Sequence, residues 1–152
     1  MSVQGQTAVA ADIIRDLCRI VKAIDDFSKH VQRRHGVSGP QLWALWELRE
    51  SGKLQVSRLA ERMCLHASTV SGIADRLEAK GLATRSRDSE DHRVVGLSIT
   101  SEGLRLLEGT PIPPRQGMQN ALEQMPEAFV EGLAQGLNTL VAVAEAGIRL
   151  EG

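Results

Sequence analysis

Aromatic residues are scarce in this chain of 152 residues. They make up 3 % of it, with two Trp, two Phe and no Tyr. Surfaces that stack on unpaired bases depend on aromatic rings, so the composition argues against a base-stacking RNA platform and against a sugar-binding groove. Cysteine is scarce as well, because Cys18 and Cys64 are too few for a secreted disulfide framework. We therefore expect a cytoplasmic protein.

Long apolar runs and a strong net charge are also missing. The first 11 residues lack the basic and apolar regions of a signal peptide. The longest uncharged stretch of the last third, residues 132–144, is too short to span a bilayer, so we expect no membrane partner. Net charge is −1, but residues 53–100 carry eight basic and six acidic groups, whereas residues 101–152 carry three and seven. The middle of the chain is thus the part suited to an anionic partner.

Apolar residues spaced by three and four predict a long helix over residues 12–34. Its narrow seam consists of Ile13, Leu17, Ile20, Ile24, Phe27 and Val31. Such a helix packs either inside its own domain or against a second subunit. A second seam, in a helix predicted over about 126–149, favours the second subunit; it consists of Phe129, Leu133, Leu137, Leu140, Ala144 and Ile148.

Between these helices the pattern changes several times. Ser38 is placed to cap a helix over 40–50, and Gly52 to end it. Two further helices are predicted over 56–63 and 67–80, separated by the turn Cys64-Leu65-His66, which is the spacing of a helix-turn-helix. Residues 82–85 and 94–99 have strand composition and flank a polar tip, and Thr100 is placed to cap another helix. The prolines of residues 111–114 stop any helix there.

The outward face of the predicted 67–80 helix carries small hydroxyl side chains at its start. A recognition helix contacts base edges with its N-terminal residues, and Ser and Thr bind bases or phosphates. The candidates on this face are Ser68, Thr69, Ser71 and Arg76. The alternative is an ordinary solvated face whose hydroxyls only start the helix.

The ribbon after this helix favours DNA binding. Arg85, Arg87 and Arg93 flank its tip, and guanidinium groups on a thin ribbon suit a narrow minor groove. Asp91, two residues before Arg93, is placed to orient it through a charge-assisted hydrogen bond. A solvated ion pair that only holds the hairpin together is the alternative for Asp91.

The order and spacing of these residues resemble the MarR family of winged helix-turn-helix regulators. The resemblance rests on Leu59-Ala60-Glu61-Arg62-Met63, Ser68-Thr69-Val70-Ser71, residues 75–82, and a wing string of Arg85, Arg87-Asp88, Asp91-His92-Arg93, Leu97, Ile99-Thr100 and Gly103. It implies a homodimer formed by the first and last helices, with Arg93 at the minor groove and Ser68, Thr69, Ser71 and Arg76 at the major groove or its phosphates. Gly72 replaces an arginine of many members, and His66 replaces a frequent capping serine.

The resulting expectation is a mainly α fold with a small β-hairpin wing (α+β). We expect one chain, 1–152, with a DNA-binding lobe at 39–100 and dimerisation helices at 10–35 and 101–150. Its partners are expected to be double-stranded DNA and a second copy of itself. Trp43 and Trp46 are expected to serve the core. The resemblance also implies a small-molecule pocket beside them, in which a ring could stack on a small aromatic or phenolic effector.

Other chemistry is weakly supported by the sequence. Cys18 and Cys64 are expected to be small packed side chains, since the tyrosines that accompany a redox-sensing cysteine in some relatives are missing. Cys64 and His66 lack further partners for a metal, and no catalytic motif is present, so we expect no cofactor, no metal and no enzyme activity. The alternatives are a winged-helix module that binds proteins and a cysteine-based redox regulator.

Overall fold

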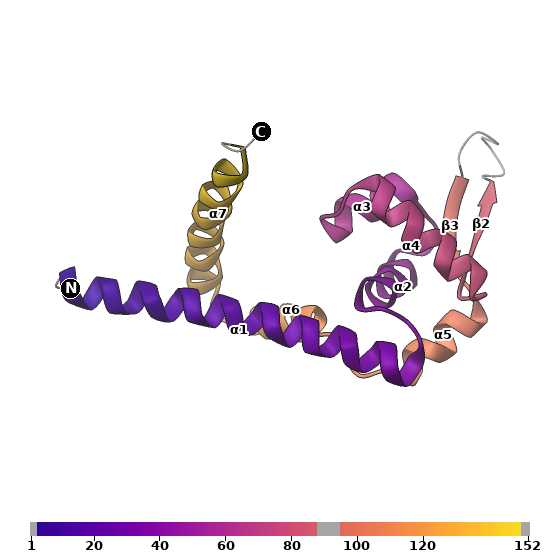
Figure 1. Ribbon diagram of the computed structural model, residues 1–152, viewed down its shortest axis with the longest axis horizontal. Helices are drawn as coiled ribbons and strands as arrows, with labels where there is room; N and C mark the ends of the chain where they lie inside the picture. The colour runs from indigo at the N-terminus through magenta and orange to yellow at the C-terminus, as the bar shows by residue number, and fades with distance from the viewer. Residues whose placement is uncertain (1–2, 88–94, 150–152) are drawn as a thin grey trace. The chain divides into compact units, whose positions relative to one another are not determined.

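Helices dominate the computed structural model, which describes residues 3–87 and 95–149 (Figure 1). By contacts within the chain it divides into two units, residues 1–114 and 115–152. In chain order the elements are α1 (Val3–His35), α2 (Gly39–Ser51), β1 (Leu54–Gln55), α3 (Val56–Met63), α4 (Ala67–Ala79), β2 (Ala83–Arg87), β3 (Val95–Ile99), α5 (Ser101–Glu108), α6 (Pro114–Glu123) and α7 (Glu127–Arg149). The expected mainly α fold with a small β wing is confirmed.

The junction between α1 and α2 follows the expected capping chemistry. Ser38 caps α2, its side chain accepting from the backbone of Gln41 while the Gln41 side chain accepts from the backbone of Ser38. The Gly39 amide donates to Ser28 Oγ of α1 at 2.9 Å, and a Cβ at Gly39 would lie 2.7 Å from the same oxygen. The close approach of α2 to α1 therefore requires glycine at this position.

One apolar core joins α1, the helix-turn-helix and the sheet. From α1 it takes Val31, and Phe27 packs against it, so the last members of the apolar seam are used inside this unit. The core also includes Leu107 of α5, beyond the expected end of the lobe at residue 100. Its other buried members are Val37, Leu42, Ala44, Leu45, Leu48, Leu59, Ala60, Met63, Val70, Ile73, Ala74, Leu77, Leu82, Ala83 and Leu97.

The sheet has three antiparallel strands in the order β1-β3-β2. The β2–β3 ribbon is the predicted wing, with Arg85 opposite Leu97 and Arg87 opposite Val95. Strand β1, which pairs Leu54 with Leu97, was not predicted. Two residues are too few to show the alternation by which a strand is recognised in a sequence.

The structure contains helix in two places where none was predicted. Helix α1 begins nine residues before the predicted start, in a stretch that contains Ala8, Ala10 and Ala11, whose helix propensity is high. Helix α6 was missed, because its first residue, Pro114, belongs to the segment that was expected only to stop helices. Proline is tolerated in the first helical turn, where its missing N–H has no partner to lose.

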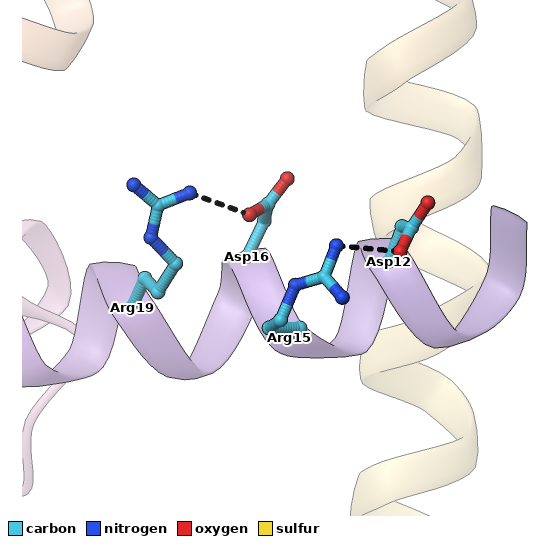
Figure 2. A network of polar contacts seen from close by, with 4 residues as sticks. All are labelled: Asp12, Arg15, Asp16 and Arg19. Atoms are coloured by element: carbon cyan, nitrogen blue, oxygen red, sulfur yellow. Dashed lines mark hydrogen bonds and ion pairs between the residues drawn. The ribbon is translucent and has the colours of Figure 1, made fainter.

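Charged residues along α1 pair with one another on a face separate from its apolar residues. Arg15 binds Asp12 at 2.5 Å, and Arg19 binds Asp16 at 3.0 Å (Figure 2). Further along, Lys22 binds Asp26 at 2.6 Å, and its hydrogen bond is the largest cause that lowers the pKa of the Asp26 carboxyl. These exposed pairs add little stability. They do give the charged side chains of this face partners within the helix itself, so the face needs no second protein to pair its charges.

A substitution at Gly103 tests the packing of α5 against the sheet. A Cβ there would lie 2.3 Å from the Leu82 carbonyl oxygen and 2.7 Å from Ile99 Cγ1. We expect Gly103→Ala to lower the free energy of unfolding by roughly 1–3 kcal/mol, because backbone has to shift to accommodate the methyl group. The measurement is chemical denaturation. Gly117→Ala in α6, where a Cβ meets nothing within 4 Å, is the control and should not destabilise.

Candidate nucleic-acid interface

Helices α3 and α4 form the helix-turn-helix. Cys64 ends α3 in the left-handed conformation, at φ 53°, and its amide donates to the carbonyls of Ala60 and Glu61. The Leu65 amide donates to the Ala60 carbonyl at 3.1 Å, which closes the turn. Ala60 itself is buried between the helices. The predicted three-residue turn is therefore confirmed.

The predicted recognition face lies on the outer side of α4. Val70, Ala74 and Leu77 are completely buried on the inner side, and Ile73 is 6 % exposed. Ser68, Thr69 and Arg76 are exposed, and Ser71 is half-buried. Since residues seven apart share a helix face, Thr69 and Arg76 lie on one flank. Ser71 and Glu78 lie on the other flank, and Glu78 contacts the wing there.

Two features leave the start of α4 open to an approaching molecule. His66 stands at the N-cap but makes no side-chain capping hydrogen bond, so the first amides of the helix are not satisfied by a cap. At Gly72, in the middle of the outer face, an added Cβ would meet nothing within 4 Å. A helix N-terminus of this kind favours an anion such as phosphate.

The wing places its arginines in different environments. The Arg87 side chain is exposed at the end of β2, where its backbone carbonyl accepts from Lys53 Nζ at 3.1 Å. Arg85 is half-buried and its guanidinium is paired with Asp75 and Glu78 of α4. Arg93 and its expected partner Asp91 lie outside the described residues.

Arg85 is held by α4 at both its backbone and its side chain. Its amide donates to Glu78 Oε1 at 2.8 Å, and its guanidinium donates to Glu78 Oε2 and lies 2.8 Å from Asp75 Oδ1. The hydrogen bond to Asp75 is the largest cause that raises the pKa of Arg85 above its ordinary value. The sequence assigned Arg85 to DNA, whereas the structure gives its charge two protein partners.

Lys53 is a wing residue that sequence reasoning missed. Its side chain lies across Gly96 of β3, where an added Cβ would come within 2.5 Å of the Lys53 carbons. From there its ammonium reaches the Arg87 carbonyl. The signal that could have found it is its position just before β1, the strand that pairs with β3.

The two tryptophans both pack against the core, as one of the two expectations held. Trp43 Nε1 donates to Glu47 Oε1 at 3.0 Å, and the other oxygen of this buried carboxylate lies 3.3 Å from Arg62 of α3. The Arg49 guanidinium lies 3.8 Å from the centre of the Trp46 ring. Both rings are therefore engaged within the chain.

Both cysteines are exposed, so the expectation that they are packed side chains is wrong. Cys18 lies in the part of α1 that is outside the core, beside Ile14 and Val21, which are also exposed. Cys64 occupies the surface turn of the helix-turn-helix. Among the described residues no group of His, Cys, Asp or Glu is large enough to hold a metal ion.

Apolar side chains on α1 and α7 are exposed in the single chain. Of the residues in the two predicted seams, Val31 is buried, and Leu17 and Phe27 are half-buried. Seven further members are between 39 % and 57 % exposed, namely Ile13, Ile20, Ile24, Phe129, Leu133, Leu137 and Leu140. Exposed apolar side chains repeated along one face of each helix mark an interaction site in a folded protein. No helix in the described ranges is both long and apolar enough to cross a membrane.

These features define a winged helix-turn-helix protein, with α4 as the second helix of the motif and β2–β3 as the wing. The family model for the MarR family matches residues 37–95. The chain is 30 % identical over 121 residues to the uncharacterised transcriptional regulator YsmB of Bacillus subtilis, covering 80 % of each protein. It therefore belongs to the MarR family of transcriptional regulators.

Another relative matches more closely over a shorter range. The transcriptional repressor MdtR of Bacillus subtilis is 39 % identical over 93 residues, which cover 61 % of this chain and 60 % of MdtR. The chain thus spans less than two thirds of that relative.

Solved structures share the fold over most of the chain. The transcriptional regulator BldR of Sulfolobus solfataricus has a TM-score of 0.63 and 27 % identity, covering 93 % of this chain and 99 % of BldR. CouR of Rhodococcus jostii RHA1, solved with p-coumaroyl-CoA, has a TM-score of 0.63 and 21 % identity, covering 87 % of this chain and 90 % of CouR.

Proposed function

We propose that this protein is a sequence-specific DNA-binding repressor that acts as a homodimer. The observation that carries the proposal is the outer face of α4. There, hydroxyl side chains surround an uncapped helix start, Arg76 is exposed in the last turn of the same helix, and the wing beside it carries arginine. This face fits the major groove, with Ser68, Thr69, Ser71 and Arg76 as its contacts. Arg87 and Arg93 of the wing then serve the adjacent minor groove, and Asp91 supports Arg93.

The exposed apolar faces of α1 and α7 support a second copy of the chain as the partner in the dimer. A twofold dimer places two recognition helices in successive major grooves about 34 Å apart. The operator is therefore a pseudo-palindrome with half-sites roughly 10 base pairs apart. Because the charged residues beside the exposed apolar part of α1 are already paired with one another, the apolar residues carry the association.

An aromatic or phenolic effector beside Trp43 and Trp46 completes the proposal. The p-coumaroyl group held by CouR is phenolic, and the shared fold supports a ligand of that class here. Such a ligand weakens DNA binding if it prefers a dimer with a different spacing of its lobes. Couplings of this kind are typically about 1–3 kcal/mol.

The first test concerns phosphate contact by Arg76. We expect Arg76→Ala to weaken binding to duplexes selected from a random library and to lower the slope of log affinity against log salt by about one, since one released counterion is lost. Fluorescence anisotropy over a salt series measures both. Arg105→Ala removes the same charge from an exposed position on α5 and should leave the slope unchanged. Equal slopes for wild type and Arg76→Ala would remove Arg76 from the interface.

Base readout by the start of α4 is tested separately. We expect Ser68→Ala and Thr69→Ala each to change which bases are selected at the major-groove positions of a half-site, because their hydroxyls bind base edges. Sequencing of bound duplexes from the random library measures the preference. Ser57→Ala on the exposed surface of α3 is the control. A loss that is uniform over all sequences would instead identify phosphate contacts.

The dimer is tested by charge on its apolar faces. We expect Ile20→Asp in α1 and Leu137→Asp in α7 each to convert dimers to monomers, because a carboxylate is costly to bury without a partner. Sedimentation velocity measures the state. Ile112→Asp, at a residue that is 61 % exposed between α5 and α6, is the control and should remain dimeric. A monomeric wild type at micromolar concentration would contradict the homodimer.

A further inference from the structure

Arg85 differs from the other arginine described in the wing. Arg85 and Arg87 are two residues apart on β2 and so share a face of the strand. Both were expected to bind DNA. The Arg87 side chain is exposed, whereas the Arg85 side chain is only 27 % exposed and lies between two carboxylates of α4.

The contact joins the wing to the recognition helix at three points. The Glu78 carboxylate accepts hydrogen bonds from both the Arg85 amide, at 2.8 Å, and the Arg85 guanidinium. Asp75, one helical turn earlier, lies 2.8 Å from the same guanidinium. Both carboxylates are contacted by the same guanidinium nitrogen, Nη1, which carries two N–H groups. The planar guanidinium fixes the direction of these groups, which a lysine ammonium on its flexible stem does not reproduce. The backbone contact also fixes the point along α4 at which β2 is held.

From this geometry we infer that Arg85 is a positioning residue, which locks the wing to the recognition helix and does not neutralise a DNA phosphate. The inference rests on the proposed DNA-binding function. Asp75 is in the middle of the outer face of α4, where its side chain is 64 % exposed. If Arg85 left for a phosphate, the carboxylates of Asp75 and Glu78 would face the DNA without a counter-charge. Arg85 in this position therefore favours DNA binding in two ways. It holds the wing on α4, and it supplies the counter-charge of these two carboxylates.

The test removes the Arg85–Glu78 pair without changing net charge. The double variant Glu78→Gln/Arg85→Met loses one negative and one positive group. We expect its affinity for the selected duplex to fall about fivefold to tenfold, with a salt slope equal to that of wild type. Arg87→Ala is the matched comparison, and its slope should fall by about one. A slope for the double variant that also falls by about one would overturn the inference.

Base preference separates positioning from general damage to the fold. We expect the double variant to lose discrimination between A·T and G·C pairs at the positions read by the wing, while the preference at the major-groove positions is retained. Arg85→Lys keeps the charge but lacks the planar guanidinium that places Nη1 between the two carboxylates, so it should show the same selective loss with an unchanged slope. An equal loss of preference at both sets of positions would overturn the positioning role.

Hydrogen exchange without DNA tests the lock on its own. We expect the amides of residues 83–87 to exchange faster in Arg85→Lys and in Glu78→Gln, while those of α2 exchange as in wild type. Unchanged exchange across residues 83–87 would overturn the inference even if the double variant does not fold. If wild type binds no duplex but the exchange rates change as expected, the proposed function fails and the lock between wing and helix stands.

Discussion

Burial of the inner face of α4 is the constraint on which the rest of the structure depends. Val70, Ala74 and Leu77 are completely excluded from solvent. Each large aliphatic side chain contributes roughly 1.5–3 kcal/mol by such burial. In a helix of 3.6 residues per turn, fixing one face fixes the other. The outer face is therefore set by packing, and its hydroxyls need no contacts of their own to be oriented.

The same helix also determines where the wing lies. Its inner face holds α4 on the core through apolar contacts, and one of its flanks holds β2 through Asp75 and Glu78. Two acidic residues on a helix that is proposed to face DNA are unfavourable by themselves. Pairing with Arg85 offsets that charge and also links the wing to α4. The net charge of the chain is −1, so the suitability for DNA comes from local arrangement and not from overall charge.

The elements with chemical boundary signals could be predicted from the sequence almost to the residue. Ser38, Gly52 and Thr100 are caps or stops in the structure as expected, and α3 has the predicted bounds. Where no such signal exists, prediction failed. Strand β1 has no period to detect, and α6 begins at a proline that was expected only to break helices.

For the site, periodicity was enough to separate the inner face of α4 from Ser68, Thr69 and Arg76. It was not enough to show the partners of Arg85, which lie seven and ten residues earlier in a different type of element. The prediction that the cysteines are packed failed for a related reason. Nearness to an apolar seam predicted burial for Cys18, but the seam itself is exposed in the single chain.

Helix α1 links the proposed dimer contact to the DNA-binding lobe through a continuous backbone. Phe27 and Val31, near its C-terminal end, pack in or against the core, whereas Ile13 and Ile20 are exposed. The ammonium of Lys80, which follows α4, donates to the Gly36 carbonyl just after α1. The core packing and this hydrogen bond thus both couple α1 to the lobe. Because packed interiors do not deform continuously, a rotation of α1 within a dimer would carry the lobe with it as a body, and the distance between the two copies of α4 would change.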